Sequence, residues 1–267
     1  MNKISQLPER IKSIPGEFIL NQKLTSGPIS QVFLCTFNNI KAVIRLDLPC
    51  ALMLAFDRMN EITLLNSIQS LQISPKVLYH DASDGILIWE FIPGEEPAFN
   101  SGDHKEHYLK LLGQTLNLIH STAAPKNCLD IFSNSMSLYK NLLENSSHQW
   151  LCDQALRLYE ELLKDGTNQV LSHNDLNHTN LLWDKKFYFL DWEYSGPNHP
   201  CFDIASIVKT YQLNQSEIDH FSIGYGGNKE LFRIKKLNQW ITFIQYLDEI
   251  WKISVNRVIE QLTDDAD

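Results

Sequence analysis

Cysteine is scarce in this sequence, and no two cysteines stand close together. The 267-residue chain has five cysteines, an odd number, and none of them forms a C-x-x-C pair. Small domains held by disulfides contain an even number of cysteines at close spacings. The cysteine pattern therefore indicates a protein of a reducing compartment, without a disulfide framework.

Long apolar runs are also missing. No stretch approaches the roughly 18 uninterrupted apolar residues that a membrane-spanning helix needs. Residues 1–18 carry charges throughout and contain no apolar segment of the kind found in signal peptides. We therefore expect a cytoplasmic protein with no membrane span.

Positive charge is in deficit, with a net charge of -9 at pH 7. Broad nucleic-acid binding needs a basic face, so we expect no nucleic-acid partner. A small anionic ligand is not excluded, because a few local cations and backbone N–H groups suffice to hold one. Apolar residues (43%) and charged residues (21%) occur at the usual globular frequencies.

The hydrophobic pattern changes near residue 93. Before it, short β-type runs surround one stretch of helical spacing without Gly or Pro, and after it the spacing is mostly helical. The expected strands are 18–24, 29–37, 40–46, 77–79, 85–91 and 187–190; the expected helices are 52–70, 104–121, two within 134–164, and more at the end. Pro93-Gly94 breaks the chain between the two parts. The order predicts an α+β, two-lobed protein-kinase-like fold, with a small β-rich N-terminal lobe (1–92) and a larger helical C-terminal lobe (93–267).

The polar run LSHNDLNHTN, residues 171–180, matches the kinase catalytic-loop pattern H-x-D-x-x-x-x-N. In that pattern the aspartate, here Asp175, faces the attacking hydroxyl, and the asparagine, here Asn180, holds Mg²⁺. Asp191 follows an apolar strand, where kinases place the second metal-binding carboxylate. We therefore predict Asp175 as the catalytic residue, and Asn180 and Asp191 as Mg²⁺ ligands.

Two other interpretations of this run are weaker. A zinc site could use His173 and His178, but no cysteine or carboxylate pair completes a tetrahedral set at a recognised spacing. A plain surface loop would explain the polarity but not the strand-like runs on both sides. His173 itself is expected to brace the loop by hydrogen bonding rather than to transfer protons.

The segment FLDWEYSGPNHPCFDIA, residues 189–205, resembles the D-[FW]-E-Y-[AS]-G-x-N-x-x-x-F-D-I segment of choline kinases. From about residue 24 to 250 the chain resembles the choline kinase and aminoglycoside phosphotransferase superfamily, which includes bacterial thiamine kinases. No A-P-E motif and no long activation segment follow Asp191, so a protein kinase is not expected. The resemblance implies a small-molecule kinase that uses ATP and Mg²⁺.

The resemblance also implies nucleotide-binding residues in the first lobe. Gly27 lies in LTSGPISQVF, where the family has a nucleotide-covering hairpin, although a plain β-turn would look the same. Arg45 stands where protein kinases carry lysine, and choline and thiamine kinases often have arginine there; otherwise it is an exposed strand arginine. Glu61 would pair with Arg45, or it is a solvated helix-face glutamate. Backbone groups from Glu90 to Ile92 would bind adenine, or the run is simply a buried edge strand.

The acceptor would be the hydroxyl of a small, cationic alcohol such as choline or thiamine. Residues 238–255 carry Trp240 and Trp251 beside carboxylates, a composition that suits a cation cage but equally suits a helix core. Glu193 would face the substrate amine or support the metal site. Ethanolamine, aminoglycoside or sugar acceptors remain alternatives, as does a kinase-like module without catalysis, which usually loses one of the aspartates kept here. The sequence leaves the oligomeric state open.

Overall fold

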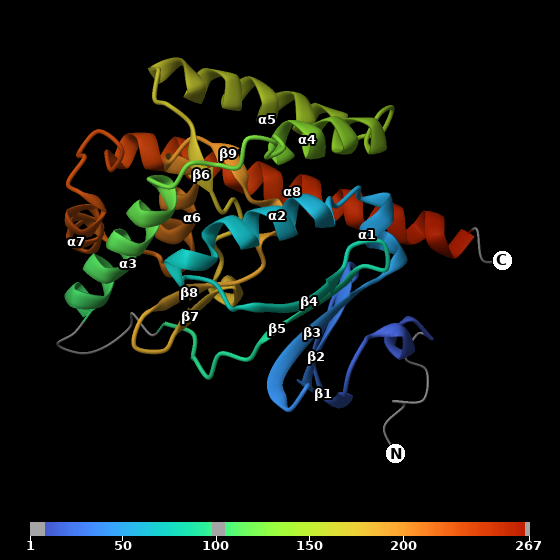
Figure 1. The fold of residues 1–267 in the computed structure, drawn as a ribbon. Helices are drawn as coiled ribbons and strands as arrows, with labels where there is room; N and C mark the ends of the chain where they lie inside the picture. The colour runs from blue at the N-terminus through green and yellow to red at the C-terminus, as the bar shows by residue number, and fades with distance from the viewer. Residues whose placement is uncertain (1–8, 98–104, 265–267) are drawn as a thin grey trace.

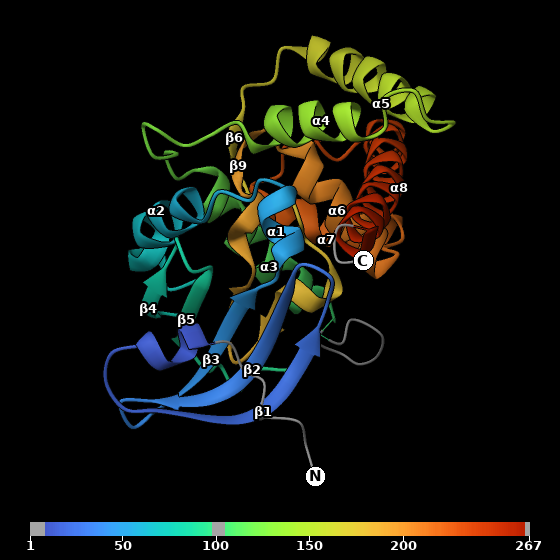
Figure 2. The same ribbon diagram turned by 90° about the vertical axis from the view of Figure 1, so that its right-hand side faces the viewer.

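The computed structural model describes residues 9–97 and 105–264. Its N-terminal part is a five-stranded antiparallel sheet in the order β1-β2-β3-β5-β4 (Figures 1 and 2). The strands are β1 (Phe18–Ser26), β2 (Ser30–Phe37), β3 (Ile40–Asp47), β4 (Val77–Asp81) and β5 (Ile86–Glu90). All five predicted strands are present, with ends shifted by at most two residues.

Strand β3 lies at the centre of this sheet, between β2 and β5. Its residues from Ala42 to Asp47 are buried, so Arg45 is carried into the interior rather than exposed. Arg45 pairs in register with Val32 of β2 and Leu87 of β5. The strand thereby places a guanidinium inside the molecule, where a partner of opposite charge is required.

The prediction of a single helix over 52–70 is wrong, because the structure has two helices there, α1 (Pro49–Met53) and α2 (Arg58–Ile68). The chain turns between them at Ala55, whose φ is 55°. Asp57 then caps α2, accepting a hydrogen bond of 2.8 Å from the Asn60 N–H. The apolar periodicity continues across the break, and the break is therefore not visible in the hydrophobic pattern.

The C-terminal part is mostly helical, as predicted. Its helices are α3 (Lys105–His120), α4 (Ile131–Leu142), α5 (Gln149–Leu162), α6 (Cys201–Tyr211), α7 (Gln215–Tyr225) and α8 (Ile234–Asp264). The predicted start of the first of these, residue 104, lies outside the described residues. Helix α8 runs across this part and packs against α4, α5 and α6, and it also contacts α1 (Figure 1).

The polar run connects two small pairs of antiparallel strands. Strand β6 (Val170–Ser172) pairs with β9 (Gly196–Asn198), and β7 (Leu181–Trp183) pairs with β8 (Phe187–Phe189). The strand-like runs on both sides of residues 173–180 are thus real strands, and β9 was not predicted. Asp191 follows β8 by two residues, and a short 3-10 turn, η6 (Trp192–Tyr194), comes next.

The hydrophobic core joins the two parts of the chain. The larger of two buried clusters contains residues of α1 and α2 together with those of the C-terminal helices, whereas a smaller cluster lies within the sheet around Ile44 and Ile88. Glu95, just after the predicted break, forms a β-bridge with Trp183. No helix among the described residues is long and apolar enough to cross a membrane.

Candidate active site

A cavity of about 590 Å³ brings most of the predicted site residues together. Its wall includes the turn between β1 and β2, the polar run, η6 and one side of α8. The predicted residues that line it are Gly27, Asp175, Asn180, Asp191, Glu193 and Trp251. A larger, more open hollow of about 710 Å³, bordered by residues 55–59 and 80–83, contains none of the predicted residues. The chemistry-bearing side chains therefore point to the smaller cavity.

Asp175 is held by the amides of its own loop. Asn180 Nδ2 donates to Asp175 Oδ2 at 2.7 Å and to the Asp175 carbonyl at 2.9 Å, and Asn177 Nδ2 donates to Oδ1 at 3.1 Å. Burial and the nearby charge of Asp191 raise the pKa of Asp175 well above its usual range. The carboxylate is thus oriented but lacks a cation that would favour its charged form.

The backbone of the loop is fixed from behind by Asp203, a buried residue of α6. Its Oδ2 accepts the N–H of His173 at 2.8 Å, and its Oδ1 accepts the N–H of Asn174 at 2.9 Å. Asn174 has a φ of 65°, in the left-handed region, immediately before Asp175. Asp203 belongs to the F-D-I match in the sequence, but no role was assigned to it there.

His173 braces the loop, as predicted. Its Nε2 lies 2.9 Å from the Leu190 carbonyl, so the hydrogen bond connects the loop to the residue before Asp191. Burial lowers the pKa of His173 to about 4, although Asp203 opposes the shift, and the ring is therefore neutral near pH 7.

A hydrogen-bond chain extends from Asp203 to two further helices. His120 of α3 places Nε2 3.1 Å from Asp203 Oδ2 and Nδ1 2.6 Å from the Tyr225 hydroxyl of α7. An Nε2 donor to the carboxylate leaves Nδ1 as the acceptor of the tyrosine proton. The catalytic-loop backbone is thus coupled through Asp203 to α3 and α7.

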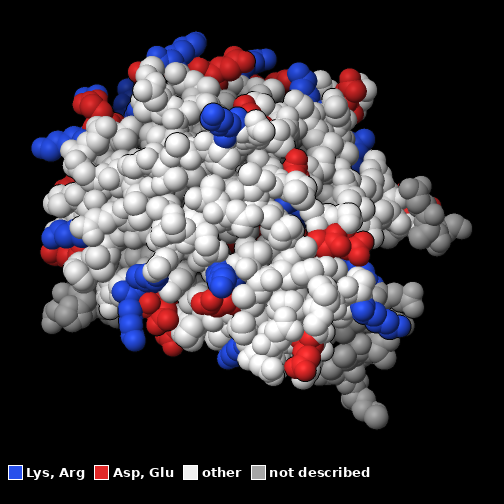
Figure 3. Space-filling model, in the orientation of Figure 1, with Lys and Arg blue, Asp and Glu red and all other residues white. Residues whose placement is uncertain are grey.

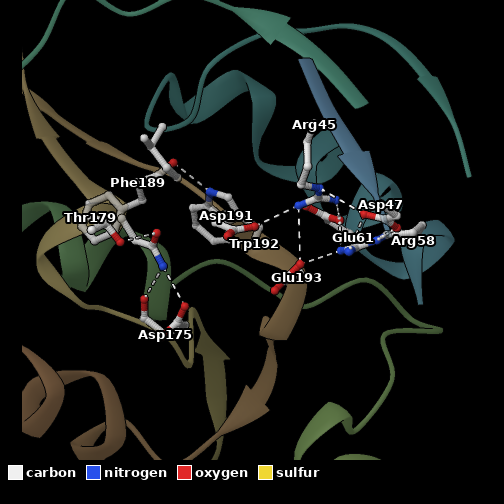
Figure 4. A network of polar contacts seen from close by, with 12 residues as sticks. Arg45, Asp47, Arg58, Glu61, Asp175, Thr179, Phe189, Asp191, Trp192 and Glu193 are labelled. Carbon is white, nitrogen blue, oxygen red and sulfur yellow. Dashed lines mark hydrogen bonds and ion pairs between the residues drawn. The ribbon is translucent and has the colours of Figure 1, made fainter. Parts of the chain in front are cut away.

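Arg45 and Glu61 form the predicted ion pair (Figure 4). Arg45 Nη2 lies 2.5 Å from Glu61 Oε2, and Nη1 lies 3.0 Å from Oε1. Arg45 Nη1 also donates to Asp191 Oδ1 at 2.8 Å. Burial raises the pKa of Glu61, but the two arginine charges outweigh it and the net shift is downward, which keeps Glu61 ionised.

A second arginine, Arg58 at the start of α2, was not predicted. It binds Asp47 with two bonds of 2.6 and 2.8 Å, and it donates to Glu193 at 2.6 Å and to Glu61 at 3.1 Å. Together with Arg45 it faces four carboxylates, those of Asp47, Glu61, Asp191 and Glu193 (Figure 4). The network is therefore short of positive charge, and burial together with Asp191 raises the pKa of Glu193 to about 7.

The oxygen ligands on this cavity fit Mg²⁺. Asp191 has 39% of its side chain exposed and is accessible from the cavity. Its removal from bulk water raises its pKa, although the charge of Arg45 opposes this shift. Mg²⁺ in phosphotransfer sites is commonly bound by one or two carboxylates together with substrate phosphates. Among the described residues, no group of three or more His, Cys, Asp or Glu side chains is arranged to hold a metal ion. Asn180 and Asp191 remain the predicted ligands.

The predicted hinge residues lie outside the cavity wall. The Glu90 N–H donates to the Lys76 carbonyl at 2.9 Å, and the Phe91 N–H donates to the Lys41 carbonyl at 3.0 Å. Neither Glu90 nor Ile92 lines the 590 Å³ cavity. An adenine contact in this segment therefore stays a prediction, as does the lobe boundary at residues 92 and 93.

Only one of the two predicted tryptophans reaches the cavity. Trp251 is half-buried, lines the cavity and donates from Nε1 to the Tyr194 hydroxyl at 2.8 Å. Trp240 is fully buried and stacks on His199 at a ring separation of 4.8 Å, so it is a core residue and does not reach the cavity. Tyr194 and Tyr139 also line the cavity, and no role was predicted for either.

Comparisons with known proteins agree with this geometry. A model of the phosphotransferase enzyme family matches residues 22–234. Protein LicA of Haemophilus influenzae is 28% identical over 206 residues, which are 72% of this chain and 59% of that protein. The chain thus spans less than two thirds of that relative.

Two solved structures share the fold. The crystal structure of choline kinase LicA from Streptococcus pneumoniae has a TM-score of 0.73 at 17% identity, covering 96% of this chain and 95% of that one. A Plasmodium vivax ethanolamine kinase has a TM-score of 0.67 at 18% identity, covering 94% of this chain and 82% of that one. These likenesses confirm the kinase-like fold predicted from the sequence.

Proposed function

Since the chain belongs to the phosphotransferase enzyme family, we propose that it transfers the γ-phosphoryl group of ATP to the hydroxyl of a small alcohol, with choline as the favoured acceptor. One observation carries the proposal: Asp175, Asn180 and Asp191 line the same cavity as the aromatic pair Tyr194 and Trp251. One side of the cavity thus carries the proposed metal ligands and would face the phosphates, and the other side is aromatic. Phosphoryl transfer needs little more than this positioning and charge neutralisation.

The residues divide the work between the two substrates. Residues 1–92 bind the nucleotide, with Arg45 oriented by Glu61 toward the phosphates and Gly27 in the hairpin above them. Asn180 and Asp191 would hold Mg²⁺, and a bound ion would supply positive charge beside the transferring phosphoryl group. Asp175 accepts the proton of the acceptor hydroxyl, and the hydrogen bonds from Asn177 and Asn180 aim its carboxylate.

The aromatic side favours an acceptor that carries a positive group. A cation over an aromatic face gains up to about 2 kcal/mol when it is desolvated. Asp248 and its ion-pair partner Lys209 both line the cavity, so together they add no net charge there. A quaternary ammonium needs no hydrogen-bond acceptor, whereas a primary ammonium does. The Glu193 carboxylate also lines the cavity and could accept hydrogen bonds from a primary ammonium, so ethanolamine and thiamine stay candidates beside choline.

An acceptor panel tests the proposal. Purified protein with ATP and Mg²⁺ is assayed with choline, ethanolamine, thiamine and kanamycin, and phosphorylated product is measured by mass spectrometry. We expect product from choline at the highest kcat/KM, and none from Asp191→Ala, which should retain its circular dichroism spectrum. Absence of product with every acceptor in the panel would reject the proposed function.

A further inference from the structure

The loop between α1 and α2 reaches the aromatic side of the cavity from outside. Phe56 in this loop is half-buried, and its ring packs edge-on against Tyr194 with 5.2 Å between centroids and 71° between planes. The Arg58 guanidinium carbon lies 4.9 Å from the centroid of the same Phe56 ring. Phe56 is therefore in contact with Arg58 of the buried ion network and with an aromatic residue of the cavity wall.

Tyr194 is held at its hydroxyl, its backbone and its ring, and its hydroxyl also forms a hydrogen bond with the side chain of Tyr139. The Tyr194 hydroxyl accepts the hydrogen bond of Trp251 Nε1 at 2.8 Å, and its carbonyl accepts the side-chain amide of Asn174 at 2.9 Å. These bonds fix the hydroxyl and the backbone. The contact with Phe56 adds a restraint on the tilt of the ring, because edge-on aromatic pairs have a preferred geometry.

We propose that Phe56 is a specificity-determining positioning residue: it sets the tilt of the Tyr194 ring and thereby the affinity for the acceptor, without touching the acceptor. Phe56 does not line the cavity, whereas Tyr194 and Trp251 do. The inference rests on the proposed function for the identity of the ligand. The loop preceding α2, more than 130 residues from Tyr194 in sequence, would thereby influence the affinity for the acceptor.

Kinetics separate positioning from simple packing. Phe56→Leu keeps an apolar side chain but removes the ring, and Phe56→Tyr keeps the ring. We expect Phe56→Leu to raise the acceptor KM about three- to tenfold, the size of one aromatic pair, and to change the KM for ATP less than twofold. Phe56→Tyr should restore the parent value. Met59→Leu, at an exposed neighbouring position, is the matched control and should change neither constant.

A double-mutant cycle tests the route through Tyr194. In a Tyr194→Leu background, Phe56→Leu should no longer change the acceptor KM, because no ring remains to be tilted. An unchanged acceptor KM in Phe56→Leu, an equal rise in both KM values, or an effect that persists in the Tyr194→Leu background would each overturn the proposal.

A spectroscopic measurement tests the positioning role of Phe56 independently of the proposed phosphotransferase activity. The indole N–H proton of Trp251, assigned by loss of its signal in Trp251→Phe, reports on the Tyr194 hydroxyl that accepts it. Phe56→Leu should shift this signal, while Phe56→Tyr and Met59→Leu should not. A shift in a protein that phosphorylates no acceptor would support the positioning and reject only the function; no shift would overturn the positioning itself.

Discussion

The proposed reaction depends most directly on the carboxylate of Asp175. An alcohol is a poor nucleophile at neutral pH, and a positioned general base contributes about 10²- to 10⁴-fold in rate. Asp175→Asn keeps the size and most hydrogen bonds of the side chain but removes its basicity. We expect kcat to fall by about that factor, with both KM values near those of the parent.

Quantifying phosphorylated product in a quenched assay checks this prediction. The alternative is that Asp175 only ties the loop together through Asn177 and Asn180. In that case asparagine would serve almost equally well, and a kcat within about threefold of the parent, well short of a general base's contribution, would show it.

His173 makes a prediction about pH. Its pKa is about 4 in the folded protein and about 6.5 when unfolded, so between these values the unfolded chain binds the extra proton. Stability should therefore fall as pH falls through this window, by about 2 kcal/mol between pH 7 and pH 5 from this group. Urea unfolding of the parent and of His173→Gln at both pH values isolates the contribution. An equal pH dependence in both proteins would contradict it.

The sequence predicted the polar loop and the ion pair of the first lobe. Asp175 and Asn180 lie five residues apart in one loop, and the family resemblance implied the pairing of Arg45 in β3 with Glu61 in α2. Arg58 and Asp203 were missed although some of their partners are near in sequence: Arg58 bonds Glu61 three residues after it and Asp47 eleven residues before it. Arg58 bonds Glu193 across 135 positions, and no periodicity signals such a pair. Burial of two arginines among carboxylates is a property of the fold and not of any short motif.

Helix α8 illustrates the same limit for a whole element. Trp240 and Trp251 lie eleven residues apart on one helix, about three turns, so helical periodicity places them on similar faces. Their depths nevertheless differ, because Tyr159 of α5 and Phe202 of α6 pack on Trp240, whereas the cavity opens beside Trp251. Which tryptophan is core and which is cavity wall depends on neighbours that the helix sequence does not specify.

The two tryptophans should therefore respond differently to substitution. Trp251→Leu should raise the acceptor KM about five- to thirtyfold, the size of a desolvated cation–π contact and its packing, with the KM for ATP unchanged. Trp240→Phe should lower Tm and leave both KM values unaltered, because it only removes packed volume. Steady-state kinetics and thermal unfolding of each variant decide between the roles, and a normal acceptor KM in Trp251→Leu would remove it from the acceptor site.

The chain of contacts from α7 through α3 to α6 predicts an effect on catalysis from outside the cavity. Tyr225→Phe removes only the hydroxyl that donates to His120 and keeps the ring packed against Phe232. One buried hydrogen bond is worth about 1 kcal/mol, so we expect a two- to tenfold lower kcat as the support of Asp203 loosens. Both KM values should stay constant. Tyr79→Phe, in β4, is the control; a lower Tm with an unchanged kcat would restrict Tyr225 to stability.

At the scale of the whole molecule, charged side chains of the sheet, of α2 and of the segment after β8 form one network of ion pairs at the active site. The sheet and α2 contribute Arg45, Arg58 and Glu61, and the segment after β8 contributes Asp191 and Glu193 (Figure 4). Acidic and basic groups are interspersed on the face that Figure 3 shows, although the whole chain has a net charge of -9. Catalytic arrangements often retain such unfavourable charge, because selection acts on function and not on the highest stability.

This view predicts that Asp191 opposes folding and serves ligand binding. Its raised pKa means that the ionised side chain is less favourable in the folded protein than in the unfolded chain at pH 7. Asn is isosteric, and it tolerates the left-handed backbone at this position, where φ is 60°. Asp191→Asn should therefore have a Tm equal to or above that of the parent when no ligand is added.

The same variant should lose the response to ligand. A non-hydrolysable ATP analogue with Mg²⁺ at about 100 times its Kd stabilises a protein by about 2.7 kcal/mol, or about 5–10 °C in a chain of this size. We expect this shift in the parent and less than a third of it in Asp191→Asn, whereas the analogue without Mg²⁺ should act weakly and alike on both. A lower unliganded Tm in the variant would show that the Arg45 ion pair outweighs the cost of partly removing the Asp191 carboxylate from bulk water. A full Mg²⁺-dependent shift in the variant would show instead that the metal is held without Asp191.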